Sequence, residues 1–167
     1  SYFTRYKSYK LENTLPQDEE TYFAGVNVGL LEMRYSQLSD AIGEGTVILW
    51  IDALGAEWLT LLRWALTQQC AASVIKDIQV VQATLPTETC FNDQWNQMDM
   101  PYKKLDKLDK LAHKGIIDDP DYYACIEDQL SFVTSIAAEV NSLLDTYHRV
   151  IITGDHGSSR LAALLFH

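Results

Sequence analysis

The sequence predicts an α/β domain with a mostly parallel sheet flanked by helices, and two observations lead to this fold class. Two runs rich in apolar and β-branched residues, 46–52 and 149–155, predict buried strands, and the continuous apolar run at 46–52 is typical of a strand buried on both faces. Segments with apolar residues at helical spacing alternate with the strands along the chain. This alternation is typical of parallel sheets, whose chemically active side chains gather beyond the carboxyl ends of the strands.

The first half of the chain supplies two helices and two strands. A helix is predicted for residues 28–42, with Gly43 as its stop, and it precedes the strand at 46–52. A second helix is predicted for 54–70, and residues 78–85 form a second predicted strand that ends at a proline. The apolar face of the second helix is formed by Trp58, Leu61, Leu62, Ala65 and Leu66.

The second half begins with a polar segment, 86–120, that is predicted to be irregular apart from a short helix within 102–115. A long amphipathic helix is predicted for 121–147, followed by the strand at 149–155 and a serine-capped helix at 158–166. The apolar stripe of the long helix is Ile126, Leu130, Val133, Ile136, Ala137, Val140 and Leu144.

Length and composition indicate one globular domain. The chain has 167 residues, of which 47% are hydrophobic and 22% charged, enough for a sizeable core. Residues 1–24 have no apolar period and are interpreted as a lead-in segment, and 25–167 as the domain. The domain is predicted to be incomplete at its carboxyl end, because the sequence stops in mid-pattern.

Charge and cysteine usage narrow the choice of partners and compartment. The net charge of −10 argues against strong binding of nucleic acid by this domain alone. The longest apolar stretch contains Asp52, Glu57 and Arg63, so no membrane partner is expected. Three widely spaced cysteines without a CxxC pattern favour a reducing, cytoplasmic compartment.

Polar side chains follow two of the predicted strands. Asp52 is the last residue of the first apolar run, where it could cap the next helix or bind a metal. Asp155 and His156 stand at the end of the last strand, between Gly154 and Gly157. The two glycines allow the chain to turn there, so that both side chains could surround a cation, although a structural histidine is an equal alternative.

Two further segments carry candidate ligands or nucleophiles. Thr87 and Thr89 follow the predicted strand at 78–85. A threonine hydroxyl becomes a nucleophile only beside a base or a metal. Without one, both threonines are interpreted as turn residues that hydrogen-bond their own backbone. Asp109 and His113 are four residues apart, so on a helix they project from one face and could share a cation. Without a metal they would be surface residues, and Asp106 is a competing ligand.

Taken in order, these segments resemble the PglZ domain of the alkaline phosphatase superfamily. The matching stretches are "WIDALGAEWL", "LPTET", "LDKLAH" and "VIITGDHGSSRLAA", of which "TGDHG" after an apolar strand is the most specific. The resemblance extends from Thr46 to the carboxyl terminus. It implies an alkaline-phosphatase-like core with two metal ions, Zn²⁺ or Mn²⁺.

The resemblance also implies a role for each matching residue. Asp52, Asp155 and His156 would hold the first ion together with Thr89, the implied nucleophile, while Thr87 is the less favoured candidate. Two cations about 4 Å apart would clamp the attacking and leaving oxygens of an in-line displacement.

The second ion would be held by Asp109 and His113 and by one further histidine downstream. His167 is the only histidine after His156, so either it or a residue beyond it would complete that site. Arg160 could bind a phosphate oxygen of the substrate or be a surface arginine.

These implications lead to a metal-dependent hydrolase of phosphoesters or phosphodiesters, with a phosphothreonine intermediate. The PglZ resemblance further implies a bacterial phage-defence protein of the BREX type, with other domains or subunits of that system as partners. A non-catalytic scaffold or binding module with the same fold is the alternative. A doubly wound nucleotide binder is less favoured, because no GxGxxG or GxxxxGK[ST] pattern follows a predicted strand.

Overall fold

The computed structural model describes residues 12, 31–70, 75–84, 88–114 and 120–157. Several predictions fall outside these residues: the lead-in segment apart from Glu12, the helix at 158–166, and the candidate site residues Thr87, Arg160 and His167.

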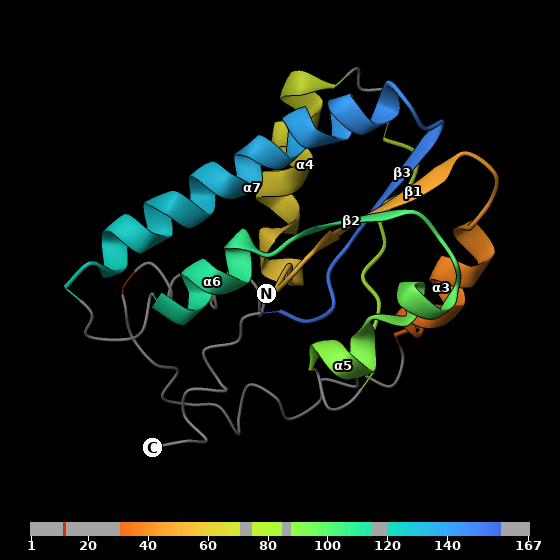
Figure 1. Cartoon of the computed structure of the whole chain (residues 1–167). Coiled ribbons are helices and arrows are strands. Elements are labelled where there is room, and N and C mark those ends of the chain that lie inside the picture. The colour runs from red at the N-terminus through yellow and green to blue at the C-terminus, as the bar shows by residue number, and fades with distance from the viewer. Residues whose placement is uncertain (1–11, 13–30, 71–74, 85–87, 115–119, 158–167) are drawn as a thin grey trace.

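The described chain is an α/β structure with a parallel sheet (Figure 1). Its elements in chain order are α3 (Arg34–Ala41), β1 (Thr46–Ile51), the 3₁₀ helix η2 (Ala56–Trp58), α4 (Leu59–Gln69), α5 (Thr89–Asn92), the 3₁₀ helix η4 (Gln94–Gln97), β2 (Tyr102–Leu105), α6 (Lys107–Lys114), α7 (Tyr122–Leu144) and β3 (Arg149–Thr153). The predicted fold class is therefore confirmed at the level of a parallel sheet flanked by helices.

Strand β1 is the centre of the sheet, whose described strand order is β2-β1-β3. It pairs in parallel with β2, with Ile48 opposite Tyr102, and with β3, with Val47 opposite Val150. All six residues of β1 are buried, as its continuous apolar run predicts. The strand at 149–155 was also expected to be buried, but β3, an outer strand of the described sheet, is only partly buried.

One face of β1 supports the larger core. Leu49 and Ile51 point to this face, because successive residues of a strand point to opposite sides of a sheet. Figure 1 shows α4 and α7 side by side over this face, with α6 beside the first turns of α7. Their buried side chains, including Leu62, Leu108 and Val133, complete the apolar cluster.

Helix α7 buries a slightly different stripe from the predicted one. Leu130 was expected inside but is 41% exposed, whereas Cys125, Gln129 and Phe132 are buried. Helix α7 packs on α6 as well as on α4, and Cys125 Sγ donates to the Leu111 carbonyl of α6 at 2.9 Å, so residues that face α6 are buried too. None of the described helices is long and apolar enough to cross a membrane.

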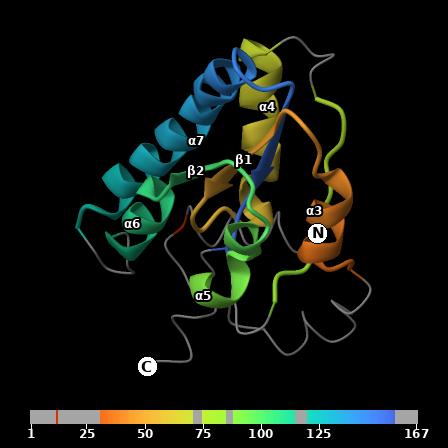
Figure 2. The same ribbon diagram turned by 45° about the vertical axis from the view of Figure 1, so that its right-hand side comes forward.

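The other face of β1 carries a smaller core. Ile48 and Trp50 pack there with Leu38 of α3 and Trp95 of η4, which is fully buried. The Trp50 and Trp95 ring centroids are 4.8 Å apart. Figure 2 shows α3 on the side of the sheet opposite α4 and α7, so the sheet lies between helices.

The prediction of a strand at 78–85 is wrong for its described residues, 78–84. They contain a single parallel bridge, between Gln82 and Met33, and no strand of the sheet. Ile78 and Val80 are 38% and 42% exposed, so their alternating apolar side chains do not insert into a core. Alternation alone does not make a strand without a partner strand and a core face to cover.

The strand beside β1 is instead β2, within the segment predicted to be irregular or helical. The two lysines of β2 made the segment look too polar for a strand, although lysine is well tolerated in an edge strand. Lys103 pairs with Glu139 of α7 at 2.6 Å, and Lys104 with Asp52 at the same distance. The short helix predicted nearby is confirmed as α6, which begins at Lys107.

Candidate metal centre

The site lies where β1 and β3 end side by side. Asp52 follows the last residue of β1, and Gly154 and Asp155 follow the last residue of β3. The two turns are in close contact: a Cβ atom on Gly154 would lie 2.3 Å from the carbonyl oxygen of Leu54. Parallel pairing and a glycine at the contact therefore bring the two predicted ligand segments together.

Asp155 is fully buried and its carboxylate is held by several donors. Its Oδ1 accepts hydrogen bonds from the backbone N–H groups of Ala53 (3.2 Å) and His156 (3.0 Å). Its Oδ2 accepts one from the Thr89 hydroxyl at 2.7 Å. Burial alone would raise the pKa of Asp155, but these bonds and the charge of His156 together hold it below its usual value.

The two carboxylate oxygens of Asp52 have different neighbours. Oδ2 lies 2.6 Å from the Lys104 ammonium, and Oδ1 lies 3.3 Å from His156 Nε2. Oδ1 is buried and accepts no hydrogen bond from the described part of the chain. Burial raises the pKa of Asp52, and the charges of Asp155 and Asp109 add to this effect, which Lys104 opposes. A second cation near Oδ1 would relieve both the burial and the repulsion.

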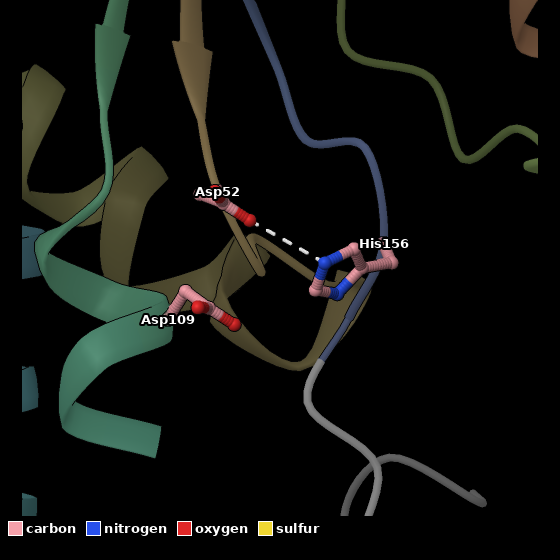
Figure 3. A group of neighbouring side chains, drawn as sticks. All are labelled: Asp52, Asp109 and His156. Carbon is pink, nitrogen blue, oxygen red and sulfur yellow. Dashed lines mark ion pairs between the residues drawn. The ribbon is translucent and has the colours of Figure 1, made fainter. Parts of the chain in front are cut away.

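Asp52, Asp109 and His156 form a group of side chains that could hold a metal ion. One ligand atom from each lies within 4.8 Å of the other two. Figure 3 shows their side chains converging from the end of β1, from α6 and from the segment after β3. Carboxylate and imidazole donors in this combination suit Zn²⁺ or Mn²⁺.

Thr89 reaches the same site from helix α5. It is the first residue of this short helix, and its Oγ1 lies 2.7 Å from Asp155 Oδ2 and 3.5 Å from His156 Nε2. Four of the predicted site residues thus form one continuous set of contacts. Asp52 contacts His156, and both His156 and Thr89 contact Asp155.

His113 lies at the margin of this set. Its Nε2 is 3.4 Å from Asp109 Oδ1, one helical turn along α6, but its side chain is 80% exposed and it is not part of the three-residue group. Asp106, the competing ligand, is paired with Lys110 at 2.5 Å instead. The structure thus brings Asp109 to the site and leaves His113 in solvent.

Two charged residues at the site were not predicted from the sequence. Lys104 binds Asp52 and lies 4.0 Å from the ring centroid of Trp50. Burial alone would lower the pKa of Lys104, but the hydrogen bond to Asp52 and nearby acidic charges raise it. No sequence pattern distinguishes Lys104 from the other lysines of its segment.

Arg34 is the other missed residue. It is buried on the same face of α3 as Leu38, four residues later, and it donates hydrogen bonds to the backbone of Gly154 and Asp155. The only available signal was this spacing, which placed an arginine on the apolar side of the predicted helix.

Comparison of the chain with protein-family models, with curated proteins and with solved structures finds no match.

Proposed function

We propose that this chain is a metal-dependent hydrolase of phosphoesters or phosphodiesters with Thr89 as its nucleophile. The observation that carries the proposal is the hydroxyl of Thr89, hydrogen-bonded to Asp155 and 3.5 Å from the imidazole of His156, which itself faces Asp52. These contacts join three segments that are far apart in the sequence. The arrangement agrees with the ligand order of the alkaline phosphatase superfamily and its PglZ domain, on which the proposed core also rests.

The donor set fits a divalent cation. The resemblance assigns Asp52, Asp155 and His156 to one ion together with Thr89, while the three-residue group of the structure joins Asp52 and His156 with Asp109. The buried Oδ1 of Asp52 accepts no hydrogen bond from the described residues and is therefore an available ligand atom. Asp109 would hold a second ion together with His113, whose Nε2 is 3.4 Å from Asp109 Oδ1. When bound, Zn²⁺ or Mn²⁺ would lower the pKa of the hydroxyl and neutralise charge on the phosphoryl oxygens.

The side chains of the chain itself supply the remaining steps. Thr89 Oγ1 would attack phosphorus and form a new P–O bond, while the bond to the leaving oxygen breaks. The hydroxyl proton has an acceptor within reach in Asp155 Oδ2, to which Thr89 Oγ1 already donates at 2.7 Å. Water would then hydrolyse the phosphothreonine and return Thr89 to its starting state.

The biological setting is also a proposal. The PglZ resemblance suggests a cytoplasmic bacterial phage-defence system of the BREX type, with its other domains or subunits as partners. The net charge of −10 supports a role in which nucleic acid is not held by this domain alone.

One contact favours the second candidate, a non-catalytic scaffold or binding module. The Lys104 ammonium lies 2.6 Å from Asp52 and already neutralises one of its oxygens. If that ion pair replaces a metal, the site would be a structural polar network rather than a catalytic one.

The two candidates are separated by measuring metal binding and hydrolysis together. Zn²⁺ and Mn²⁺ are titrated calorimetrically into the chain, and turnover of bis(4-nitrophenyl) phosphate and 4-nitrophenyl phosphate is followed. Thr89→Ala is expected to reduce kcat by roughly 10³-fold or more, as loss of a nucleophile does in other enzymes. Thr67→Ala, an exposed threonine on α4, is the matched control and should leave kcat unchanged.

Two results would contradict the proposal. Undiminished turnover by Thr89→Ala would remove the nucleophile assignment. Absence of both metal uptake and turnover in the unaltered chain would favour the scaffold.

A further inference from the structure

Arg34 is a buried arginine at the point where three segments of the site meet. It is the first residue of α3 and is only 4% exposed. Its Nη1 donates to the carbonyl oxygens of Gly154 (2.5 Å) and Asp155 (3.0 Å), in the turn that carries His156. Its Nη2 donates to Asn92, at the other end of the short helix that begins with Thr89.

Asn92 extends this contact to a third segment. It is fully buried, and its Oδ1 accepts from Arg34 (3.0 Å) and from the backbone N–H of Thr84 (2.8 Å). Its Nδ2 donates to the carbonyl oxygens of Thr84 (2.9 Å) and Glu88 (3.0 Å). Through one guanidinium and one amide, α5 is therefore bonded to the Asp155 turn on one side and to residue 84 on the other.

A purely space-filling role would not select an arginine here. Desolvation of a guanidinium is costly, and an apolar side chain of similar volume is often at least as stabilising in a buried position. Burial lowers the pKa of Arg34, an effect that the charges of Asp155 and Asp93 oppose. The planar fork of the guanidinium instead offers directed donors, which here reach backbone oxygens of two separate segments.

We propose that Arg34 is a positioning residue, which holds the Thr89 helix in register with the Asp155–His156 turn. The contact to be maintained is the 2.7 Å hydrogen bond between Thr89 and Asp155, which neither element makes without the other in place. As a contribution to hydrolysis, this role rests on the proposed function. As a mechanical link between the two segments, it can be measured without any activity.

The first experiment measures that link by amide hydrogen exchange. In Arg34→Met, amides that depend on the joined segments are expected to exchange at least about tenfold faster, while α4 and α7 keep their protection. The reporters are the N–H groups of Thr84, Phe91 and His156. Arg149→Met is the matched control, since that exposed arginine donates to Ala41 and should leave the reporters unchanged.

Arg34→Lys keeps the charge and replaces the fork by a single ammonium, so it provides a second variant if Arg34→Met does not fold. It is expected to accelerate the same amides, because one ammonium cannot span both segments. Unchanged exchange at the reporters, or an equal rise at every amide of the core, would overturn the proposal.

The second experiment measures the consequence for the site. In both Arg34 variants, Zn²⁺ affinity should fall about 10- to 100-fold, as it does when groups that orient metal ligands are removed. Turnover of bis(4-nitrophenyl) phosphate should lose kcat with little change in KM, because the buried Arg34 would not contact the substrate. A rise in KM alone, with Zn²⁺ affinity retained, would contradict a positioning role.

The two proposals fail in different ways. If the unaltered chain neither binds metal nor turns over substrate, the hydrolase proposal is lost, and selective acceleration of the reporter amides still decides whether Arg34 links the segments.

Discussion

Gly154→Ala tests whether close contact between two turns creates the site. Gly154 follows β3, and a Cβ atom at this position would lie 2.3 Å from the Leu54 carbonyl oxygen and 3.0 Å from the Leu54 Cβ. The nearest atom belongs to the backbone, so it cannot move aside as the end of a flexible side chain could. The Asp155 turn and the turn after Asp52 would have to separate.

The size of the effect follows from these distances. Close carbon–oxygen contacts in proteins lie at about 3.3 Å or more, so the two turns must move apart by about 1 Å. Forcing additional atoms into packed structure costs about 1–3 kcal/mol in the free energy of unfolding. For a chain of this length, a loss of about 2 kcal/mol lowers Tm by roughly 4–8 °C. The same displacement would cost about 100-fold in kcat if the site is catalytic.

The assay is urea unfolding of Gly154→Ala beside Gly43→Ala. At Gly43 the nearest atom to an added Cβ is Thr46 Oγ1 at 4.0 Å, so the control should change the free energy of unfolding by less than about 1 kcal/mol. Equal stabilities of the two variants would refute the reasoning, because they would mean that the turns are not in the close contact described.

Three further predictions concern single positions. Asp109→Asn should weaken Zn²⁺ binding about tenfold more than His113→Ala, measured calorimetrically, since Asp109 belongs to the three-residue group and His113 is 80% exposed. Equal effects would contradict the geometry of the site. Ala53→Val should lower the free energy of unfolding, measured in urea, by about 2 kcal/mol or more. Position 53 is buried and has φ of 64°, which β-branched residues avoid. An unchanged free energy of unfolding would refute this. In the native chain, iodoacetamide should modify the exposed Cys90 first and Cys70 slowly, because burial raises the pKa of the Cys70 thiol. Mass spectrometry of the labelled peptides measures this order, and faster labelling of Cys70 than of Cys90 would contradict the prediction.

Local sequence patterns correctly predicted the central strand and the long helix, whose patterns of apolar residues continue along their whole length. The run at 46–52 became the central strand because every residue in it is apolar or β-branched up to Asp52. The helix at 122–144 is long enough for its apolar period to be unmistakable. Since parallel strands end at a common edge, the same patterns also predicted that Asp52 would lie near Asp155 and His156.

Tertiary contacts decided the rest. Residues 102–105, and not 78–84, pair with β1 in the sheet. The more polar segment is accommodated there because Lys103 and Lys104 form ion pairs with Glu139 and Asp52. The local sequence does not predict which of the two segments pairs with β1, because the hydrogen bonds of a strand are made to residues far away along the chain.

By itself, therefore, the sequence determined which side chains stand at the ends of its two apolar strands. Only the tertiary structure decided what surrounds them: Lys104 against Asp52, and Arg34 between Asn92 and Asp155. The physical reason is that an apolar strand is selected by its own residues, whereas a buried charge is tolerated only where distant groups satisfy it, and those groups are known only once the chain is folded.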